Sequence, residues 1–310
     1  MLIKCNKCGT TVDSKEEQCF QCGCSIKEFE AITICDTVTV IGNDFQNNTT
    51  LKNIIIPNSV TKIGAFAFSG CSSLTVLIVP DSVTEIGRGA FNECSSLQNI
   101  VLSNTLTKIN EFTFSNCSSL ENIILPSSIT EILGDSFRDC SSLKNIVIPD
   151  SVTLISGDVF YRCVSLKNII IPNSVTWLGG SSFEDCSSLE SIVLPRALPG
   201  IQKCTFRGCK ALKNVVLPKS LFYIDEWAFD GCSSLESIII PNSVNSIHEW
   251  AAFDSCSSLS LVTAPEKFRK SFPLSVTFIS SLENNSTQSS SLHTLLTSQR
   301  TQDYLFQSTD

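Results

Sequence analysis

Residues 140–162 read CSSLKNIVIPDSVTLISGDVFYR, and this stretch decides the fold because close copies of it fill most of the chain. Successive copies start 23 residues apart, with one step of 24, and a Phe-x-x-Cys motif aligns them. The phenylalanines of this motif stand at 68, 91, 114, 137, 160, 183, 206, 229 and 253. An earlier copy has Phe45, with Asn48 in the cysteine position, so we expect about ten copies. A fixed period of this length is typical of solenoids.

The first half of each copy predicts a short strand. In the quoted copy, Leu143, Ile146 and Ile148 follow the L-x-x-L-x-L spacing of leucine-rich repeats. Pro149 ends the strand because proline lacks the N–H group that a ladder needs. The Ser-Val-Thr stretch that follows favours extended structure over helix, although the far side of each copy could also be a helical or 3₁₀ turn. Since stacked units bury apolar faces that single units cannot, we expect a β-rich repeat solenoid with a continuous parallel sheet.

This repeat resembles the BspA-like leucine-rich repeat family. The resemblance rests on the pattern IPxSVTxIGxxAFxxCxSL and covers about residues 31–265. It implies a leucine-rich-repeat solenoid and a role in protein interaction, and known members include surface proteins of bacteria and many proteins of parasitic protists. The N-terminal sequence MLIKCNKCG has no apolar signal core. We therefore expect a cytoplasmic location, with the cell surface as the alternative.

Four cysteines near the N-terminus indicate a metal site. Cys5 and Cys8 form one C-x-x-C pair, Cys19 and Cys22 form a second, and a glycine follows each pair. Two such pairs bring four thiolates together tetrahedrally, as Zn²⁺ prefers, and glycine permits the positive φ of a tight turn. We predict a zinc ribbon over residues 1–27. The zinc would be structural, because four cysteine ligands leave no open coordination position.

A second set of cysteines recurs in the repeats, three residues after each phenylalanine from Phe68 onward. An odd number of them, nine, without C-x-x-C spacing, argues against disulfides or metal in a reducing compartment. A small apolar side chain that also donates a weak hydrogen bond suits a buried turn. We therefore expect this cysteine column to pack in the core. Its members are Cys71, Cys94, Cys117, Cys140, Cys163, Cys186, Cys209, Cys232 and Cys256.

The chain divides into four predicted parts. The ribbon, residues 1–27, precedes a solenoid over residues 28–265. Residues 266–279 are predicted to cap the open end. Residues 280–310 are rich in Ser, Thr, Asn and Gln, a composition typical of a disordered tail.

Composition and motifs argue against several function classes. The only two histidines, His248 and His293, lie in the irregular last repeat and in the tail, and no phosphate-binding or hydrolase motif is present. We therefore predict that the chain is not an enzyme. A net charge of −8 opposes binding to a phosphate backbone, so a zinc-dependent nucleic-acid binder is an unfavoured alternative. The longest apolar runs are far shorter than the ~18 residues of a membrane span.

A candidate binding surface lies where the repeats differ from one another. The position directly before the second conserved isoleucine is charged in the early copies and alternates in sign, as neighbouring rungs should: Lys62, Glu85, Lys108 and Glu131. The same position later turns apolar. We expect an exposed patch that binds a protein partner, because aromatic side chains dominate interaction hot spots. The patch comprises Leu154, Trp177, Phe222 and Tyr223. The alternative is that these side chains cover local packing.

Another apolar column stands four residues after each repeat leucine. These side chains should point away from the core, onto the outer face of the sheet. The preference of β-branched residues for strands explains them, and self-association or ligand binding is the alternative. The column comprises Ile55, Ile78, Val101, Ile124, Val147, Ile170, Val193, Val216 and Ile239. Taken together, the sequence predicts a non-catalytic protein-interaction scaffold, with a surface antigen or adhesin as the alternative and the oligomeric state left open.

Overall fold

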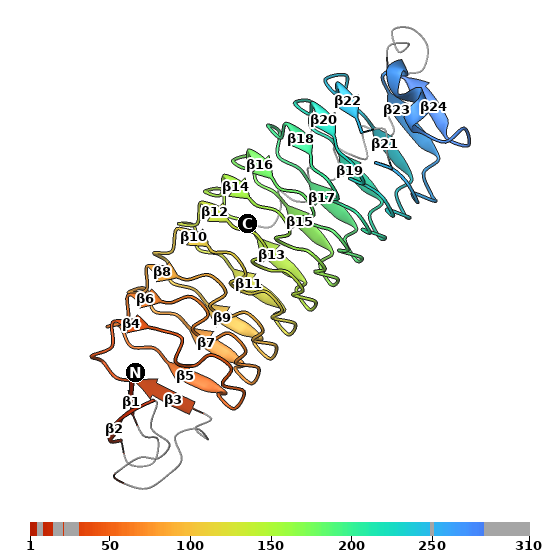
Figure 1. Ribbon diagram of the computed structural model, residues 1–310. Coiled ribbons are helices and arrows are strands. Elements are labelled where there is room, and N and C mark those ends of the chain that lie inside the picture. Colours follow the sequence, from red (N-terminus) through yellow and green to blue (C-terminus); the bar gives the residue numbers. More distant parts are fainter. Residues whose placement is uncertain (5–8, 15–20, 22–30, 249–250, 282–310) are drawn as a thin grey trace, which may run out of the picture.

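The protein is an elongated solenoid in which successive turns stack along one axis, as the computed structural model shows (Figure 1). The structure describes residues 1–4, 9–14, 21, 31–248 and 251–281. Each turn of the solenoid, here called a coil, corresponds to one sequence repeat. Figure 1 shows two rows of strands that run along the length of the molecule.

The first row contains the longer strands of the coils. Its members are β3 (Ala31–Ile34), β5 (Asn53–Ile55), β7 (Val76–Ile78), β9 (Asn99–Val101), β11 (Asn122–Ile124), β13 (Asn145–Val147), β15 (Asn168–Ile170), β17 (Ser191–Val193), β19 (Asn214–Val216), β21 (Ser237–Ile239) and β23 (Leu261–Ala264). Bonded neighbours in this row are parallel, and equivalent residues face one another, as Ile123 faces Ile146. The predicted parallel pairing is therefore confirmed, but the sheet is not continuous, because the row divides into several hydrogen-bonded sheets.

The second row contains two-residue strands. Its members are β4 (Val40–Ile41), β6 (Lys62–Ile63), β8 (Glu85–Ile86), β10 (Lys108–Ile109), β12 (Glu131–Ile132), β14 (Leu154–Ile155), β16 (Trp177–Leu178), β18 (Gly200–Ile201), β20 (Tyr223–Ile224) and β22 (Ser246–Ile247). The bonded pairs are again parallel and in register. Extended structure therefore follows the Ser-Val-Thr stretch, as its composition predicts.

The third side of each coil is a turn that carries the repeat phenylalanine. Positive φ values flank this residue, for example 58° at Asp158 and 56° at Arg162 around Phe160. Alternate N–H groups donate to the next coil: those of Asp158, Phe160 and Arg162 reach carbonyl oxygens at 3.0, 2.9 and 2.8 Å. The turn side is thus a third hydrogen-bonded ladder rather than a stack of helices.

Aromatic rings fill the centre of the solenoid. The repeat phenylalanines from Phe45 to Phe253 stack on one another with ring centroids 5.2–5.8 Å apart. These distances lie in the range of offset stacking, the favourable arrangement of two aromatic rings. Phe272 continues the stack at 5.0 Å, with its ring tilted. The core is therefore continuous from one end of the repeat array to the other.

Non-repeat elements complete both ends of the sheet. The hairpin of β1 (Leu2–Lys4) and β2 (Thr11–Asp13) is antiparallel, and β1 also pairs antiparallel with β3. Ile3 and Val12 bury their side chains in the core. At the other end, the 3₁₀ helix η1 (Glu266–Ser271) leads to β24 (Thr277–Ser280), which pairs parallel with β23. The region predicted to cap the open end therefore supplies one more strand.

Candidate interaction surfaces

The cysteine column lies inside the solenoid and joins neighbouring coils. Each Sγ donates to the carbonyl oxygen of a phenylalanine in the preceding coil at 3.1–3.2 Å, as Cys140 does to Phe114. All nine thiols are free, and burial raises the pKa of Cys71 to about 12. Because metal ligands and nucleophiles are thiolates, protonated thiols of this kind fill space and donate. The predicted packing role is confirmed.

The four predicted zinc ligands, Cys5, Cys8, Cys19 and Cys22, lie outside the described residues. Within the part of the chain that the structure describes, no cluster of three or more His, Cys, Asp or Glu side chains could hold a metal ion. Gly9, directly after the first cysteine pair, has a φ of 74°. This is the left-handed conformation expected of a glycine at the end of a zinc-binding turn. The zinc site stays a prediction.

The predicted aromatic patch lies on the second row of strands. Trp177 in β16 is 43% exposed, and Phe222 beside β20 is 55% exposed. Leu154 and Tyr223 are half-buried. Leu154 pairs with Trp177 across β14 and β16, so these two side chains are neighbours on one face. The structure thus brings an exposed tryptophan to a position where earlier coils carry charges.

Gly200 separates the two halves of the patch. It lies between Trp177 and Tyr223 along the row, and a Cβ atom at Gly200 would collide with the Tyr223 ring. The ring therefore lies over the glycine, and its hydroxyl meets the Gln202 side-chain amide. This arrangement holds the Tyr223 ring in place over Gly200.

The first row of strands presents the second apolar column to solvent, as its spacing predicts. We call this column, from Ile55 to Ile239, the outer stripe. Its most exposed member is Ile124, at 83%. Polar contacts run beside it between neighbouring coils. The Lys144 Nζ lies 2.8 Å from the Glu121 Oε2, and the Asn145 Nδ2 donates to the Asn122 Oδ1 at 3.4 Å. This ion pair links two neighbouring coils beside the outer stripe.

A cavity interrupts the outer face between β19 and β21. Its volume is about 460 Å³, and Val216, Ile239 and Pro241 are among its lining residues. Lys219 and Asn242 add polar groups to its lining. The strands β19 and β21 belong to separate hydrogen-bonded sheets, as do β5 and β7, β9 and β11, and β13 and β15. The cavity therefore opens beside two members of the outer stripe, Val216 and Ile239.

Comparison with known proteins identifies the repeat. A family model described as "BspA type Leucine rich repeat region" matches residues 13–143, 107–207 and 179–309. The chain belongs to the BspA-type leucine-rich repeat family. The predicted resemblance is confirmed. A search of the curated proteins found no match.

Several solved structures are similar to this BspA-type chain. A leucine-rich repeat protein from Bacteroides ovatus is 27% identical with a TM-score of 0.51, over 80% of this chain and 76% of that one. The pneumococcal vaccine antigen PcpA is 23% identical with a TM-score of 0.55, over 81% and 74%, and shows the fold alone. A leucine-rich cell surface protein from Faecalibacterium prausnitzii is 28% identical with a TM-score of 0.47, over 75% and 78%.

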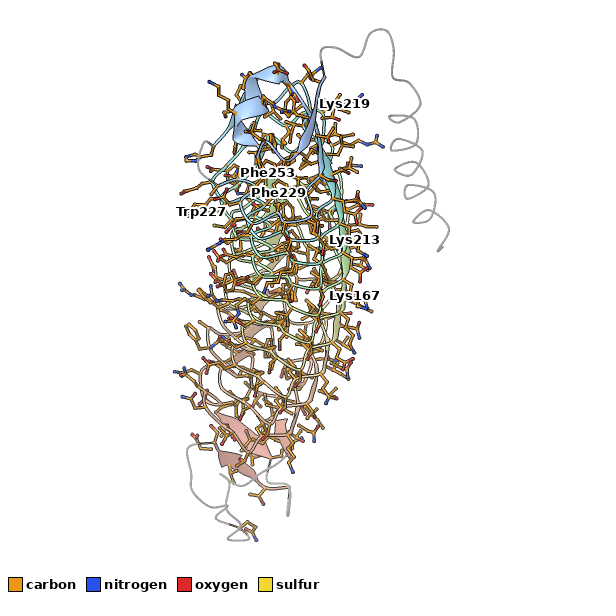
Figure 2. The ribbon with its side chains drawn as sticks, turned by 90° about the vertical axis from the view of Figure 1, so that its right-hand side faces the viewer. Lys167, Lys213, Lys219, Trp227, Phe229 and Phe253 are labelled. Carbon is orange, nitrogen blue, oxygen red and sulfur yellow. The ribbon has the colours of Figure 1, made fainter. Side chains whose placement is uncertain are left out.

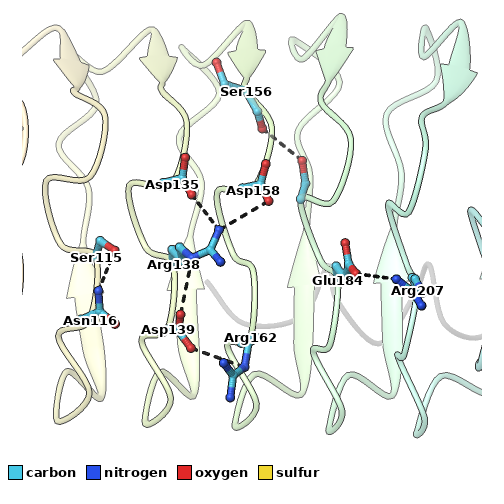
Figure 3. Close-up of polar contacts among 11 residues, drawn as sticks. Ser115, Asn116, Asp135, Arg138, Asp139, Ser156, Asp158, Arg162, Glu184 and Arg207 are labelled. Carbon is cyan, nitrogen blue, oxygen red and sulfur yellow. Dashed lines mark hydrogen bonds and ion pairs between the residues drawn. The ribbon is translucent and has the colours of Figure 1, made fainter.

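The turn side of the BspA-type repeats carries charged contacts that sequence reasoning missed (Figure 3). Arg138 lies 3.0 Å from Asp135 and 3.8 Å from Asp158 of the next coil. Arg207 reaches Glu184 and Asp230 on either side at 3.3 and 3.2 Å. Each of these carboxylates is paired with a guanidinium group. The residues around the repeat phenylalanine vary from copy to copy, and this variation is the sequence signal for these contacts.

Aromatic side chains strengthen the turn side. The Lys203 Nζ lies 4.6 Å from the centre of the Trp227 ring, and Arg138 lies 4.2 Å from that of Tyr161. Figure 2 shows Trp227 at the edge of the solenoid, away from Lys213 and Lys219. Cation–π contacts of this kind contribute about 0.5–1 kcal/mol at exposed sites. The Lys203 contact covers one face of the Trp227 ring, so we do not count Trp227 among the exposed apolar residues that could bind a partner.

Proposed function

We propose that this BspA-type chain is a non-catalytic scaffold that binds a protein partner through the aromatic patch Leu154, Trp177, Phe222 and Tyr223. The exposed indole of Trp177 is the observation that carries the proposal. In earlier coils the same position holds ion-paired charges, and Lys62 lies 2.9 Å from Glu85. Exposed tryptophan and tyrosine are enriched in binding hot spots, whereas the fold needs no aromatic group here.

The test is quantitative affinity purification with the full chain as bait. Trp177→Ser is expected to lower the recovery of the partner about 30-fold, because a hot-spot residue contributes about 2 kcal/mol or more. Phe222→Ser is expected to act in the same direction. Lys62→Ser changes the same position on a distant coil and serves as the matched control. Full retention of every partner by the Trp177 and Phe222 variants would contradict the proposal.

We also propose that Cys5, Cys8, Cys19 and Cys22 hold a structural Zn²⁺. The paired spacing and the positive φ of Gly9 support this, and the hairpin of β1 and β2 flanks the first pair. A bound zinc would supply folding energy to a segment too short to have its own core. Elemental analysis of the purified chain is expected to find one zinc per chain, and Cys8→Ser is expected to lose it. Zinc in the Cys8→Ser chain would instead indicate another site.

A cell-surface antigen or adhesin is the second candidate. Family membership favours it over the cytoplasmic location that the N-terminal sequence predicts, because known members of the family include bacterial surface proteins. No helix in the described part of the chain is long and apolar enough to cross a membrane. Labelling of intact cells with a membrane-impermeant reagent distinguishes the two locations. Labelling before lysis supports the surface, and labelling only after lysis supports the cytoplasm.

A further inference from the structure

The described chain ends at the rim of the cavity on the outer face. The Ser281 N–H donates to the Ala264 carbonyl at 3.0 Å, and its hydroxyl bonds to the Asn242 side chain. Asn242 itself lines the cavity between β19 and β21. Ser281 thus contacts a residue that lines the cavity, so residues 282–310 begin next to it. The outer stripe is exposed on the same face.

The sequence of residues 282–310 complements that face in polarity. After Leu282, its apolar side chains come in two groups separated by polar residues: Leu292, Leu295 and Leu296, then Tyr304, Leu305 and Phe306. The first group has the i, i+3, i+4 spacing that places three side chains on one side of a helix. No Asp, Glu, Lys or Arg stands between Glu283 and Arg300. Such a segment has apolar surface to bury and few charges to desolvate.

The net charge of residues 282–310 also favours binding to the outer face. Residues 282–310 contain Glu283, Asp303 and Asp310 against one arginine, a net charge of −2. Lys219 lines the cavity, and Lys213 stands on the same side of the solenoid (Figure 2); no ion pair of either side chain is found among the described residues. Opposite charges at the rim of an interface fix its register and orientation.

We propose that residues 282–310 bind to the outer face of their own solenoid, with leucines of the first group in the cavity between β19 and β21. The remaining apolar residues then cover neighbouring members of the outer stripe. This surface lies on the first row of strands, so it is separate from the aromatic patch on the second row and does not depend on the function proposed for that patch.

The length of residues 282–310 and their covalent link to the solenoid favour this segment over a separate molecule as the occupant of the outer face. At about 3.3 Å per residue, the 14 residues from Ser281 to Leu295 reach up to about 46 Å. Rungs are about 4.8 Å apart, so Ile124 lies only about 24 Å along the stripe from Ile239. A tethered segment acts at an effective concentration in the millimolar range, so a weak intrinsic affinity keeps it bound.

Photo-cross-linking in the full chain tests the proposal. A benzophenone amino acid in place of Leu296 is expected to cross-link within one chain to peptides containing residues 213–219 or 237–243, with a yield independent of protein concentration. Val216→Asp places a charge in the cavity lining and is expected to lower that yield about tenfold. Ile55→Asp changes the same column seven rungs away and is expected to leave the yield unchanged.

The remaining outcomes overturn the proposal. Cross-links to the turn side or to the second row would place the segment elsewhere. Cross-links only between chains, with a yield that rises with concentration, would make a second copy the occupant. Equal cross-linking yields in the Val216 and Ile55 variants would show that the segment does not bind in the cavity. Circular dichroism of both variants checks that the fold is kept, and hydrogen exchange of residues 292–306 is expected to speed up only in Val216→Asp.

Discussion

At the scale of single residues, the repeat cysteine acts as a hydrogen-bond donor between coils. The Phe114 carbonyl accepts the N–H of Cys117 in its own turn at 3.1 Å and the thiol of Cys140 from the next coil at 3.1 Å. A carbonyl oxygen has two lone pairs, and the two donors use both. The thiol thus satisfies a buried polar atom while it fills apolar space, which neither alanine nor a larger side chain would do.

Because these thiols are buried and protonated, they should resist chemical modification in the folded protein. At pH 8 the reagent needs thiolate, and burial raises the pKa of Cys256, even at the less covered end of the column, to about 12. Titration with a disulfide reagent is expected to leave the nine column thiols unmodified until the chain unfolds. Rapid reaction of most of them under native conditions would show that the column is accessible.

The same pKa shifts predict that stability falls at alkaline pH. An unfolded thiol has a pKa of about 8.5, and the folded Cys71 thiol has one of about 12. Between these values the unfolded chain loses protons that the folded chain keeps. Each buried thiol therefore lowers the free energy of unfolding by about 1.4 kcal/mol per pH unit above pH 8.5. Urea unfolding at pH 7 to 10.5 measures this slope.

A single substitution provides the control for the alkaline slope. Burial raises the pKa of Cys140 well above its usual range, so Cys140→Ser removes one titrating group. The slope of the free energy against pH is expected to become shallower by about 1.4 kcal/mol per pH unit. If the wild-type chain keeps the same stability from pH 8.5 to 10.5, the thiols do not remain protonated as proposed.

The packing role of the cysteine column was predictable, whereas the backbone around it was not. The odd count and the fixed spacing sufficed to separate these thiols from the N-terminal four. The left-handed conformations two residues before and after each repeat phenylalanine from Phe68 to Phe253 leave no such signal. Phe66, Asp135 and Cys204 adopt φ values of 55–56°, although such residues rarely do so. Hydrogen bonds to the next coil hold them there, and such tertiary constraints are not written in local sequence.

At the scale of the element, each coil is held by three ladders and by its ring in the aromatic stack. The Phe160 ring lies 5.6 Å from Phe137 and 5.3 Å from Phe183, and its side chain is fully buried. Its backbone also donates to the next coil. A coil therefore loses two ring contacts at once when its phenylalanine is shortened.

This position makes Phe160→Ala strongly destabilising. The expected loss in free energy of unfolding is about 3–5 kcal/mol, since a large buried side chain leaves a cavity that neighbours on both sides cannot fill. Phe278→Ala is the matched comparison at the end of the stack. Phe278 is only partly buried and lies 6.2 Å from Phe272, so its loss should cost clearly less. Urea unfolding of both variants measures the difference, and equal costs would contradict the continuous-stack account.

Strand positions followed from the sequence within the repeats, but not for the hairpin of β1 and β2 or for the last strand. The stretch FPLSVTFI, residues 272–279, has the same Pro-x-Ser-Val-Thr pattern that precedes the second row. It also forms the same turn, because the Val276 N–H donates to the Pro273 carbonyl as the Val152 N–H does to the Pro149 carbonyl. The strand that follows, β24, nevertheless joins the first row beside β23. Which edge a strand joins depends on the edge left open by the last coil, and local pattern does not encode this.

At the scale of the whole molecule, the solenoid is a linear array in which each coil contacts only its neighbours. The fold class and the exposed side of the aromatic patch followed from the repeat period, because period fixes which residues align in columns. Partner identity did not follow, since binding depends on the few positions that leave the pattern. Gly200 illustrates this: its role in supporting the Tyr223 ring emerges only when both coils are placed side by side.

This linear arrangement predicts that removal of the proposed zinc acts only on one end. The hairpin of β1 and β2 extends the sheet through the pairing of β1 with β3, and Ile3 and Val12 close the core there. If zinc folds residues 1–27, a chelator should release the hairpin and expose β3. Stability in such arrays is a sum of units and nearest-neighbour interfaces, so coils far from the end should not respond.

Hydrogen exchange with and without chelator measures this effect. Exchange is expected to speed up in β1, β2 and β3, to change slightly in β5, and to stay constant from β11 to β21. Cys8→Ser should reproduce the pattern without chelator, and re-addition of zinc should restore protection in the wild type alone. Uniform acceleration along the solenoid would show that the metal controls global stability. Unchanged exchange in β1 and β2 would show that the hairpin holds to β3 by side-chain burial alone, without help from zinc.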